Sequence, residues 1–301
     1  METAKQITIL DGGTGFQLNS VSDSPLWGSQ MLETDSEKVR IVHENFIKAG
    51  AQILYSNTYS LHLKSDDEEE KKRISTLFEE NIKILEDLVR SYPGTDYFIS
   101  IGPFAVFYRD CSEYSGVYLK DERKICESDV LRHYEQMLDL VEATGKKHVV
   151  FETIPSFLEV KAALKAIEKH EKMKCFLTVY AADEEKTGAG DRIEDISRLV
   201  NKSEKVEAFG VNCCDPRLCV PISNTLSKIL KPEIPIVIKP NCGKYYNLDS
   251  KEYEGESYDL RKDIPELYKN KVRFIGGCCT VGPETIKEYK DFIEEWQYGP
   301  E

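Results

Sequence analysis

The sequence predicts an α/β fold: a single (β/α)8 barrel of the TIM type, with its functional site at the C-terminal ends of the strands. Eight short apolar or β-branched runs alternate with amphipathic helical patterns along the chain. The runs are almost continuously apolar, which is typical of parallel strands buried on both faces. Several connections that follow the runs are long, whereas connections that precede them, such as 50–51 and 145–147, are short. An open, doubly wound sheet is the alternative fold.

The predicted strands are recognised by their short length and their β-branched or apolar side chains. In chain order, we expect them at residues 7–10, 52–55, 97–101, 148–151, 175–180, 208–211, 235–238 and 272–275.

The first two long helices follow the first and second strands. Thr34 and Glu37 are spaced as a capping box for one of them, and Gly50 is placed to end it. The other covers 74–89, where apolar residues repeat at three and four positions. The charged run 66–73 that precedes this repeat is expected to be the solvated start of the helix.

Later helices are predicted by the same periodicity. Ser156 with Glu159 opens one of them, and the helix at 260–270 is the weakest because Pro265 interrupts it. The other helices are expected at 131–141, 157–167, 193–199, 222–229 and 286–296.

The lengths of the loops indicate which face of the barrel carries the functional site. Segments 102–127 and 240–262 far exceed the usual length of about 2 to 6 residues for a strand-to-helix connection. Both follow strands, so the elaboration lies at the C-terminal face, where barrel enzymes keep their active sites. No internal repeat or low-complexity linker divides the chain, and we expect residues 1–301 to form one catalytic domain.

Composition limits the partners. The formal net charge is -13 and no long basic stretch offsets it, which argues against nucleic acid or an anionic membrane surface. No apolar run approaches the roughly 20 residues needed to span a bilayer, and the start of the chain is too short and polar for a signal peptide. We therefore expect a cytoplasmic protein that acts on small molecules.

Three of the nine cysteines stand at predicted strand ends: Cys213, and the adjacent pair Cys278 and Cys279. An odd number of cysteines without a secretory signal makes a disulfide framework unfavourable. Three thiolates around zinc leave one position open, as in a catalytic site. The alternative is that these cysteines are small buried hydrophobic residues.

Two acidic residues end other strands on the same predicted rim. Asp11, followed by Gly12 and Gly13, ends the first strand, and Glu152 ends the fourth. Carboxylates suit an ammonium group and backbone amides suit a carboxylate, so together they fit an α-amino acid. The alternatives are an Asx-capped glycine turn for Asp11 and a helix N-terminal acid for Glu152.

Taken together, these motifs resemble the homocysteine S-methyltransferase family, a family of zinc-containing (β/α)8 barrels. The resemblance covers nearly the whole chain and includes Asp11-Gly12-Gly13, 46–51, 101–103, 112–116, 151–155, Gly210-Val211-Asn212-Cys213, Lys239-Pro240-Asn241 and Gly276-Gly277-Cys278-Cys279. It implies that Cys213, Cys278 and Cys279 hold one Zn²⁺ per chain. It also implies that Asp11, Gly12, Gly13 and Glu152 bind the amino-acid head of homocysteine.

The resemblance further implies the reaction: methyl transfer to the thiol of L-homocysteine, giving methionine, with no catalytic side chain beyond the zinc-activated substrate thiol. The betaine-using branch carries Tyr after the glutamate, whereas this chain has Thr153. That difference favours a sulfonium donor, S-methylmethionine or S-adenosylmethionine. Tyr59, Phe104 and Tyr114 on the long loops are candidates to bind the sulfonium by cation–π contact, or else pack within the loops.

Two alternatives stay open at this point. The acceptor can be another thiol or a selenol such as selenocysteine. In a different class, the three cysteines can form a non-catalytic zinc or thiol-redox site in a barrel of the same fold.

Overall fold

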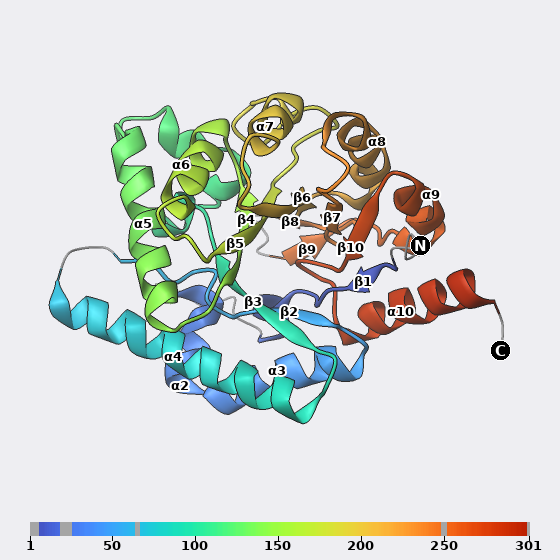
Figure 1. Cartoon of the computed structure of the whole chain (residues 1–301), viewed down its shortest axis with the longest axis horizontal. Coiled ribbons are helices and arrows are strands. Elements are labelled where there is room, and N and C mark those ends of the chain that lie inside the picture. The colour runs from blue at the N-terminus through green and yellow to red at the C-terminus, as the bar shows by residue number, and fades with distance from the viewer. Residues whose placement is uncertain (1–5, 19–25, 64–66, 248–251, 300–301) are drawn as a thin grey trace.

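Eight parallel strands form the centre of the molecule in the computed structural model, which describes residues 6–18, 26–63, 67–247 and 252–299 (Figure 1). All eight correspond to predicted strands: β1 (Thr8–Ile9), β2 (Ile53–Tyr55), β3 (Asp96–Ile101), β4 (His148–Ile154), β5 (Lys174–Val179), β6 (Val206–Asn212), β7 (Ile236–Lys239) and β10 (Val272–Ile275).

The sheet curls into a barrel. Its strand order is β1-β10-β7-β6-β5-β4-β3-β2, and every neighbouring pair in it is parallel. Leu10 meets Ile53 in a parallel bridge that joins the two ends of this order. The predicted (β/α)8 barrel is therefore confirmed over the open doubly wound sheet.

Helices surround the sheet, as Figure 1 shows. The long ones are α3 (Ser36–Lys48), α4 (Glu68–Ser91), α5 (Glu127–Ala143), α6 (Phe157–Ile167), α7 (Ile193–Val200), α8 (Cys219–Ile229) and α10 (Pro283–Tyr298). Short helices are α1 (Thr14–Gln17), α2 (Met31–Thr34) and α9 (Ile264–Lys269). Residues 1–5 at the predicted polar start and Asp66, the first residue of the predicted charged run, lie outside the described residues.

Two helix starts differ from the sequence prediction. Asp35, not Thr34, caps α3, accepting from the Lys38 amide at 3.2 Å, because Thr34 is itself the last residue of α2. Pro265 does not interrupt the helix after β7; it lies in the first turn of α9, where a missing N–H costs nothing. By contrast, Ser156 caps α6 as expected, accepting from the Glu159 amide at 3.1 Å.

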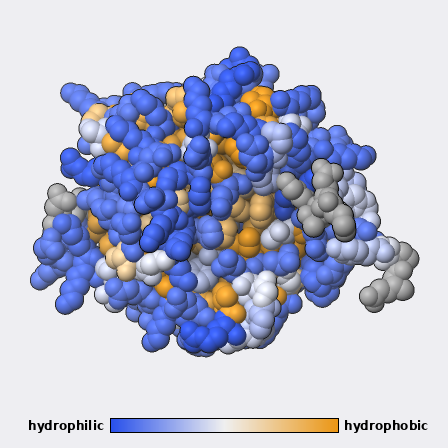
Figure 2. Space-filling model, viewed as in Figure 1, coloured by the Kyte–Doolittle hydropathy of each residue, from blue (hydrophilic) through white to orange (hydrophobic). Residues whose placement is uncertain are grey.

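A second apolar cluster takes at least one side chain from each barrel strand or its end. Its buried members are Leu10, Tyr55, Phe98, Val150, Phe176, Ala208 and Val237, and the partly buried Ile53 and Phe274 pack against them. A larger apolar core lies between the sheet and the helices. In Figure 2 the outer surface is mostly hydrophilic, and hydrophobic residues gather toward the centre of the face.

The long loop after β7 contains a structure that the sequence analysis missed. Strands β8 (Tyr245–Asn247) and β9 (Glu252–Glu254) pair antiparallel as a hairpin. Tyr253 of this hairpin packs edge-on against Phe16 of α1, with ring centroids 5.6 Å apart. Because α1 follows β1, the hairpin lies at the C-terminal face of the barrel. Across the described part of the chain, the helices are too short or too polar to cross a membrane.

Candidate active site

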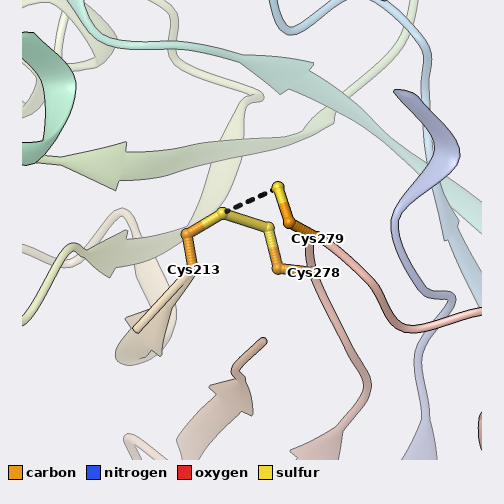
Figure 3. A group of neighbouring side chains, drawn as sticks. All are labelled: Cys213, Cys278 and Cys279. Carbon is orange, nitrogen blue, oxygen red and sulfur yellow. Dashed lines mark hydrogen bonds between the residues drawn. A yellow bond between two sulfur atoms is a disulfide. The ribbon is translucent and has the colours of Figure 1, made fainter. Parts of the chain in front are cut away.

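The three predicted ligand cysteines lie together at the C-terminal ends of β6 and β10. Cys213 directly follows β6, and Cys278 and Cys279 stand in the turn after β10. Their sulfur atoms all lie within 4.8 Å of one another, and those of Cys213 and Cys279 are 4.0 Å apart (Figure 3). The fold thus brings together residues that are remote in sequence.

Cys213 and Cys278 are joined as a disulfide, and Cys279 is a free thiol beside them (Figure 3). The sequence analysis expected three separate thiolates. Two sulfurs close enough to share one metal ion are also close enough to form a bond when oxidised. The disulfide must therefore be reduced before all three cysteines can act as ligands.

The donor set fits zinc. Thiolates are soft ligands that select zinc, copper(I) or iron–sulfur clusters over hard cations such as magnesium. Three converging cysteines match the three protein ligands of a catalytic zinc site, which keeps its fourth position for water or substrate. Whether Cys213, Cys278 and Cys279 bind zinc stays a prediction.

Gly12 and Gly13 pack directly on the cysteine turn. The Gly13 amide donates to the Val281 carbonyl at 3.0 Å, and a Cβ on Gly13 would collide with the Cys278 carbonyl. A Cβ on Gly12 would lie 2.7 Å from the Phe46 ring. Only glycine permits this approach of the two backbones, so the loop after β1 borders the cysteine cluster.

Asp11 lies beneath this loop and is fully buried. One carboxylate oxygen accepts from the Tyr55 amide at 2.8 Å, and the other is 3.1 Å from the ammonium of Lys239. Burial raises the pKa of Asp11, and the charge of Lys239 opposes that rise. The structure thus gives Asp11 a protein partner in addition to any substrate.

Lys239 is a site residue to which the sequence analysis gave no role. Besides pairing with Asp11, its ammonium donates to the carbonyls of Gly12 at 3.1 Å and Gly277 at 2.6 Å. It therefore connects the ends of β7, β1 and β10. The available signal was a lysine ending an otherwise apolar strand, since a buried ammonium requires a buried acceptor.

Glu152, near the end of β4, is 8% exposed and held by two neighbours. It accepts from the Ser100 hydroxyl and from the Asn212 side-chain amide, the latter at 3.3 Å. Burial raises the pKa of Glu152, and the charge of Lys239 opposes that rise. The sequence analysis did not assign Ser100 or Asn212, because their role depends on neighbouring strands.

Several residues at these strand ends have strained backbone conformations. Thr153, Cys213 and Thr280 adopt left-handed φ values of 62°, 56° and 66°. The β4–β5 register shifts between Phe151 and Ile154, the stretch that contains Glu152 and Thr153. Such irregularities are common next to active sites. Each left-handed residue costs about 1–3 kcal/mol, and such strain clusters at functional sites.

The three aromatic residues that are candidates to bind the sulfonium differ in their surroundings. Phe104 packs within its own loop against Phe107 and Tyr118, with ring centroids 5.3 and 6.0 Å away, which is the loop-packing alternative. Tyr59 and Tyr114 stay candidates: burial raises the pKa of both hydroxyls, and the charge of Cys279 contributes to each rise.

Comparison with known proteins agrees with this geometry. The profile of the homocysteine S-methyltransferase family matches residues 8–293. Homocysteine S-methyltransferase 1 of Arabidopsis thaliana is 28% identical over 303 residues, covering 92% of this chain and 90% of the relative. Betaine-homocysteine S-methyltransferase of Drosophila melanogaster is 25% identical over 322 residues, covering 96% and 95%.

Solved structures show the same fold. The metallated form of the homocysteine methyltransferase MmuM from Escherichia coli superposes with a TM-score of 0.79 at 23% identity, covering 95% of this chain and 96% of that one. The oxidized form of MmuM gives 0.80 at 21% identity, with 96% of each chain covered.

Proposed function

Because this chain belongs to the homocysteine S-methyltransferase family, we propose that it transfers a methyl group from a sulfonium donor to the thiol of L-homocysteine at a zinc site. Family membership makes the chain a homocysteine methyltransferase. The donor, S-methylmethionine or S-adenosylmethionine, and the zinc ion are the proposed parts. The observation that carries the proposal is the convergence of three cysteine sulfurs within 4.8 Å beside the Gly12–Gly13 loop.

We assign Cys213, Cys278 and Cys279 as the ligands of one Zn²⁺. Zinc bound there would lower the pKa of the substrate thiol, so that the thiol is present as thiolate at neutral pH. A free thiol has a pKa of about 8.5 and is mostly protonated under those conditions.

The remaining site residues position homocysteine. We assign the substrate ammonium to Glu152, whose carboxylate is oriented by Ser100 and Asn212. Gly12 and Gly13 carry no side chains, so the amino-acid head can approach the backbone closely. Asp11 adds negative charge below the loop and, through Lys239, fixes the carbonyl of Gly12.

The chemistry needs no protein base. The substrate thiol loses its proton to solvent, and the resulting thiolate attacks the methyl carbon in line. The bond from that carbon to the sulfonium sulfur breaks, and the donor leaves as a neutral thioether. No proton moves at carbon. Holding the two sulfurs in line removes several kcal/mol of entropic barrier, which is the contribution that a preformed site makes.

A donor panel tests the proposal. Reduced, zinc-loaded protein is incubated with homocysteine and S-methylmethionine, S-adenosylmethionine or betaine, and methionine is quantified. We expect turnover with a sulfonium, and Cys213→Ala to abolish both zinc binding and turnover. Betaine as the best donor would contradict the assigned donor, and no transfer from any of the three would favour the non-catalytic thiol site. Replacing homocysteine by selenocysteine tests the alternative acceptor.

A further inference from the structure

The loop between β3 and α5 carries a carboxylate that the reaction scheme above does not use. Glu113 lies in a short 3-10 helix, Ser112–Tyr114. Its Oε2 atom is buried and has no hydrogen-bond partner among the residues that the structure describes. Burial raises the pKa of Glu113 to about 7, and the charge of Asp110 adds to the rise.

The 3-10 helix that carries Glu113 packs against β4, the strand that carries Glu152. Burial raises the pKa of Tyr59, and the next contributions come from the charges of Glu113 and Glu152. The pKa of Tyr114 is raised by burial, then by the charges of Cys279 and Glu113. Both tyrosine hydroxyls thus lie within electrostatic reach of Glu113 and of Cys279.

The two tyrosines are fixed in place. Tyr59 packs on Gly102 at the end of β3, where a Cβ would lie 3.1 Å from its ring, and its carbonyl accepts from the Gly102 amide at 3.2 Å. The Tyr114 ring packs edge-on against Tyr180, with centroids 5.0 Å apart. Aromatic faces beside a carboxylate form an environment that attracts a cation.

A carboxylate oxygen that is buried without a hydrogen-bond partner, as Oε2 of Glu113 is, destabilises the folded protein unless a donor or a positive charge meets it. No lysine, arginine or histidine forms an ion pair with Glu113 within the described ranges. The donors of this reaction class bring such a charge, because the methyl group to be transferred sits on a sulfonium or a quaternary ammonium.

We infer that Glu113, with Tyr59 and Tyr114, binds the positively charged methyl-bearing centre of the donor. This inference rests on the proposed function for the presence of a cationic donor, and it adds the residue that recognises the charge. Transfer of the methyl group neutralises the donor. The attraction is therefore strongest for the bound donor and weaker in the transition state. Glu113 thus acts mainly on donor binding, and without it the site would distinguish less between the charged donor and the neutral product.

Glu113→Gln tests the inference, with Glu122→Gln as the matched control because Glu122 is exposed on the same loop. Binding of S-methylmethionine, S-adenosylmethionine and betaine to reduced, zinc-loaded protein is measured by calorimetry, and KM and kcat are measured for the donor that the wild type uses. We expect Glu113→Gln to weaken binding and raise KM for that donor about 10- to 100-fold, with KM for homocysteine and zinc content unchanged.

Stability separates this role from a structural one. Without donor, Glu113→Gln should unfold at the same temperature as the wild type or higher, since it removes a carboxylate whose buried Oε2 has no partner. Loss of a side chain needed for packing would instead lower the unfolding temperature. Glu113→Asp should retain part of the affinity. Wild-type turnover with an unchanged donor KM in Glu113→Gln would overturn this inference alone. If the wild type neither binds nor uses any of the three donors, both this inference and the proposed function are wrong.

Discussion

At the scale of single residues, the site depends on buried charges that are satisfied in pairs. Lys239 has a side chain that is 4% exposed and contacts Asp11, Gly12 and Gly277. Removing one member of a buried pair leaves the other charge uncompensated, which costs more than the pair itself contributes.

We predict that Lys239→Met lowers the free energy of unfolding by about 3–5 kcal/mol, because Asp11 then stays buried without its partner. Urea denaturation measures the change. Lys228→Met is the control, since Lys228 is exposed on α8. The double variant Asp11→Asn, Lys239→Met should recover part of the loss, and equal stability of Lys239→Met and the wild type would contradict the pairing.

His43 of α3 gives the protein a specific sensitivity to acid. The ring is fully buried, neither nitrogen has a hydrogen-bond partner among the described residues, and burial lowers its pKa to about 4. The folded state therefore binds fewer protons than the unfolded state between pH 6.5 and 4. The stability that neutral His43 contributes is present above pH 6.5 and is lost as the pH falls through this window.

We predict that His43→Leu makes stability less dependent on pH. Through this residue, the free energy of unfolding of the wild type should be about 2 kcal/mol lower at pH 5 than at pH 7. The variant should not show this loss. Unfolding followed by circular dichroism at both pH values gives the comparison. If the free energy of unfolding changes equally in the two proteins from pH 7 to pH 5, His43 is protonated in the folded state.

At the scale of elements, α6 holds the long loop after β3 against the barrel. Glu159 of α6 accepts from the hydroxyls of Tyr118 and Tyr134 and from the Phe104 amide, the last at 2.8 Å. Tyr118 and Phe104 belong to the loop that also carries Glu113. One buried carboxyl group thus fixes the segment that borders the proposed donor site.

Tyr118→Phe should loosen this loop without changing the barrel. We expect the free energy of unfolding to fall by about 1–3 kcal/mol, the range for a lost hydrogen bond to a buried group. Trypsin should also cut faster after Lys120 or Lys124. Mass spectrometry of the fragments locates the cuts, and Tyr298→Phe is the control because Tyr298 is 68% exposed. Unchanged cleavage would mean that the hydrogen bond from Tyr118 to Glu159 does not hold the loop.

At the scale of the whole molecule, the cysteine cluster exists only when strands β6, β7 and β10 are assembled side by side. Cys213 follows β6, and Cys278 and Cys279 follow β10, with β7 between these strands in the sheet. An unfolded chain does not hold these sulfurs together, so metal binding should favour the folded state.

We predict about one zinc per chain after reduction, a higher unfolding temperature with zinc than without, and less zinc in protein that is not reduced. Metal analysis and thermal unfolding, each with and without reductant, provide the measurements. Cys213→Ala should lose both the bound zinc and the rise in unfolding temperature with zinc. Cys175→Ala, which removes a buried thiol outside the cluster, should keep full zinc content. Full zinc content in Cys213→Ala would rule out the assigned ligands.

Much of this architecture is predictable from local patterns. The sequence predicts all eight barrel strands, because each is a short and mainly apolar run, typical of strands in a parallel sheet. The start of α3 was misplaced, because Thr34 and Asp35 are both good caps and only the preceding helix α2 decides between them. The β8–β9 hairpin was missed because its short strands lack a strong apolar pattern.

The sequence by itself determined the fold class, the placement of three cysteines at strand ends and the resemblance that names their chemistry, because periodicity and motif spacing are local properties. Only the tertiary structure decided which groups meet. It paired Lys239 with Asp11, turned Glu159 toward Tyr118, and left Oε2 of Glu113 buried without a partner among the described residues. The partner of a buried charge is set by distance through space, and no local pattern in a single chain records that distance.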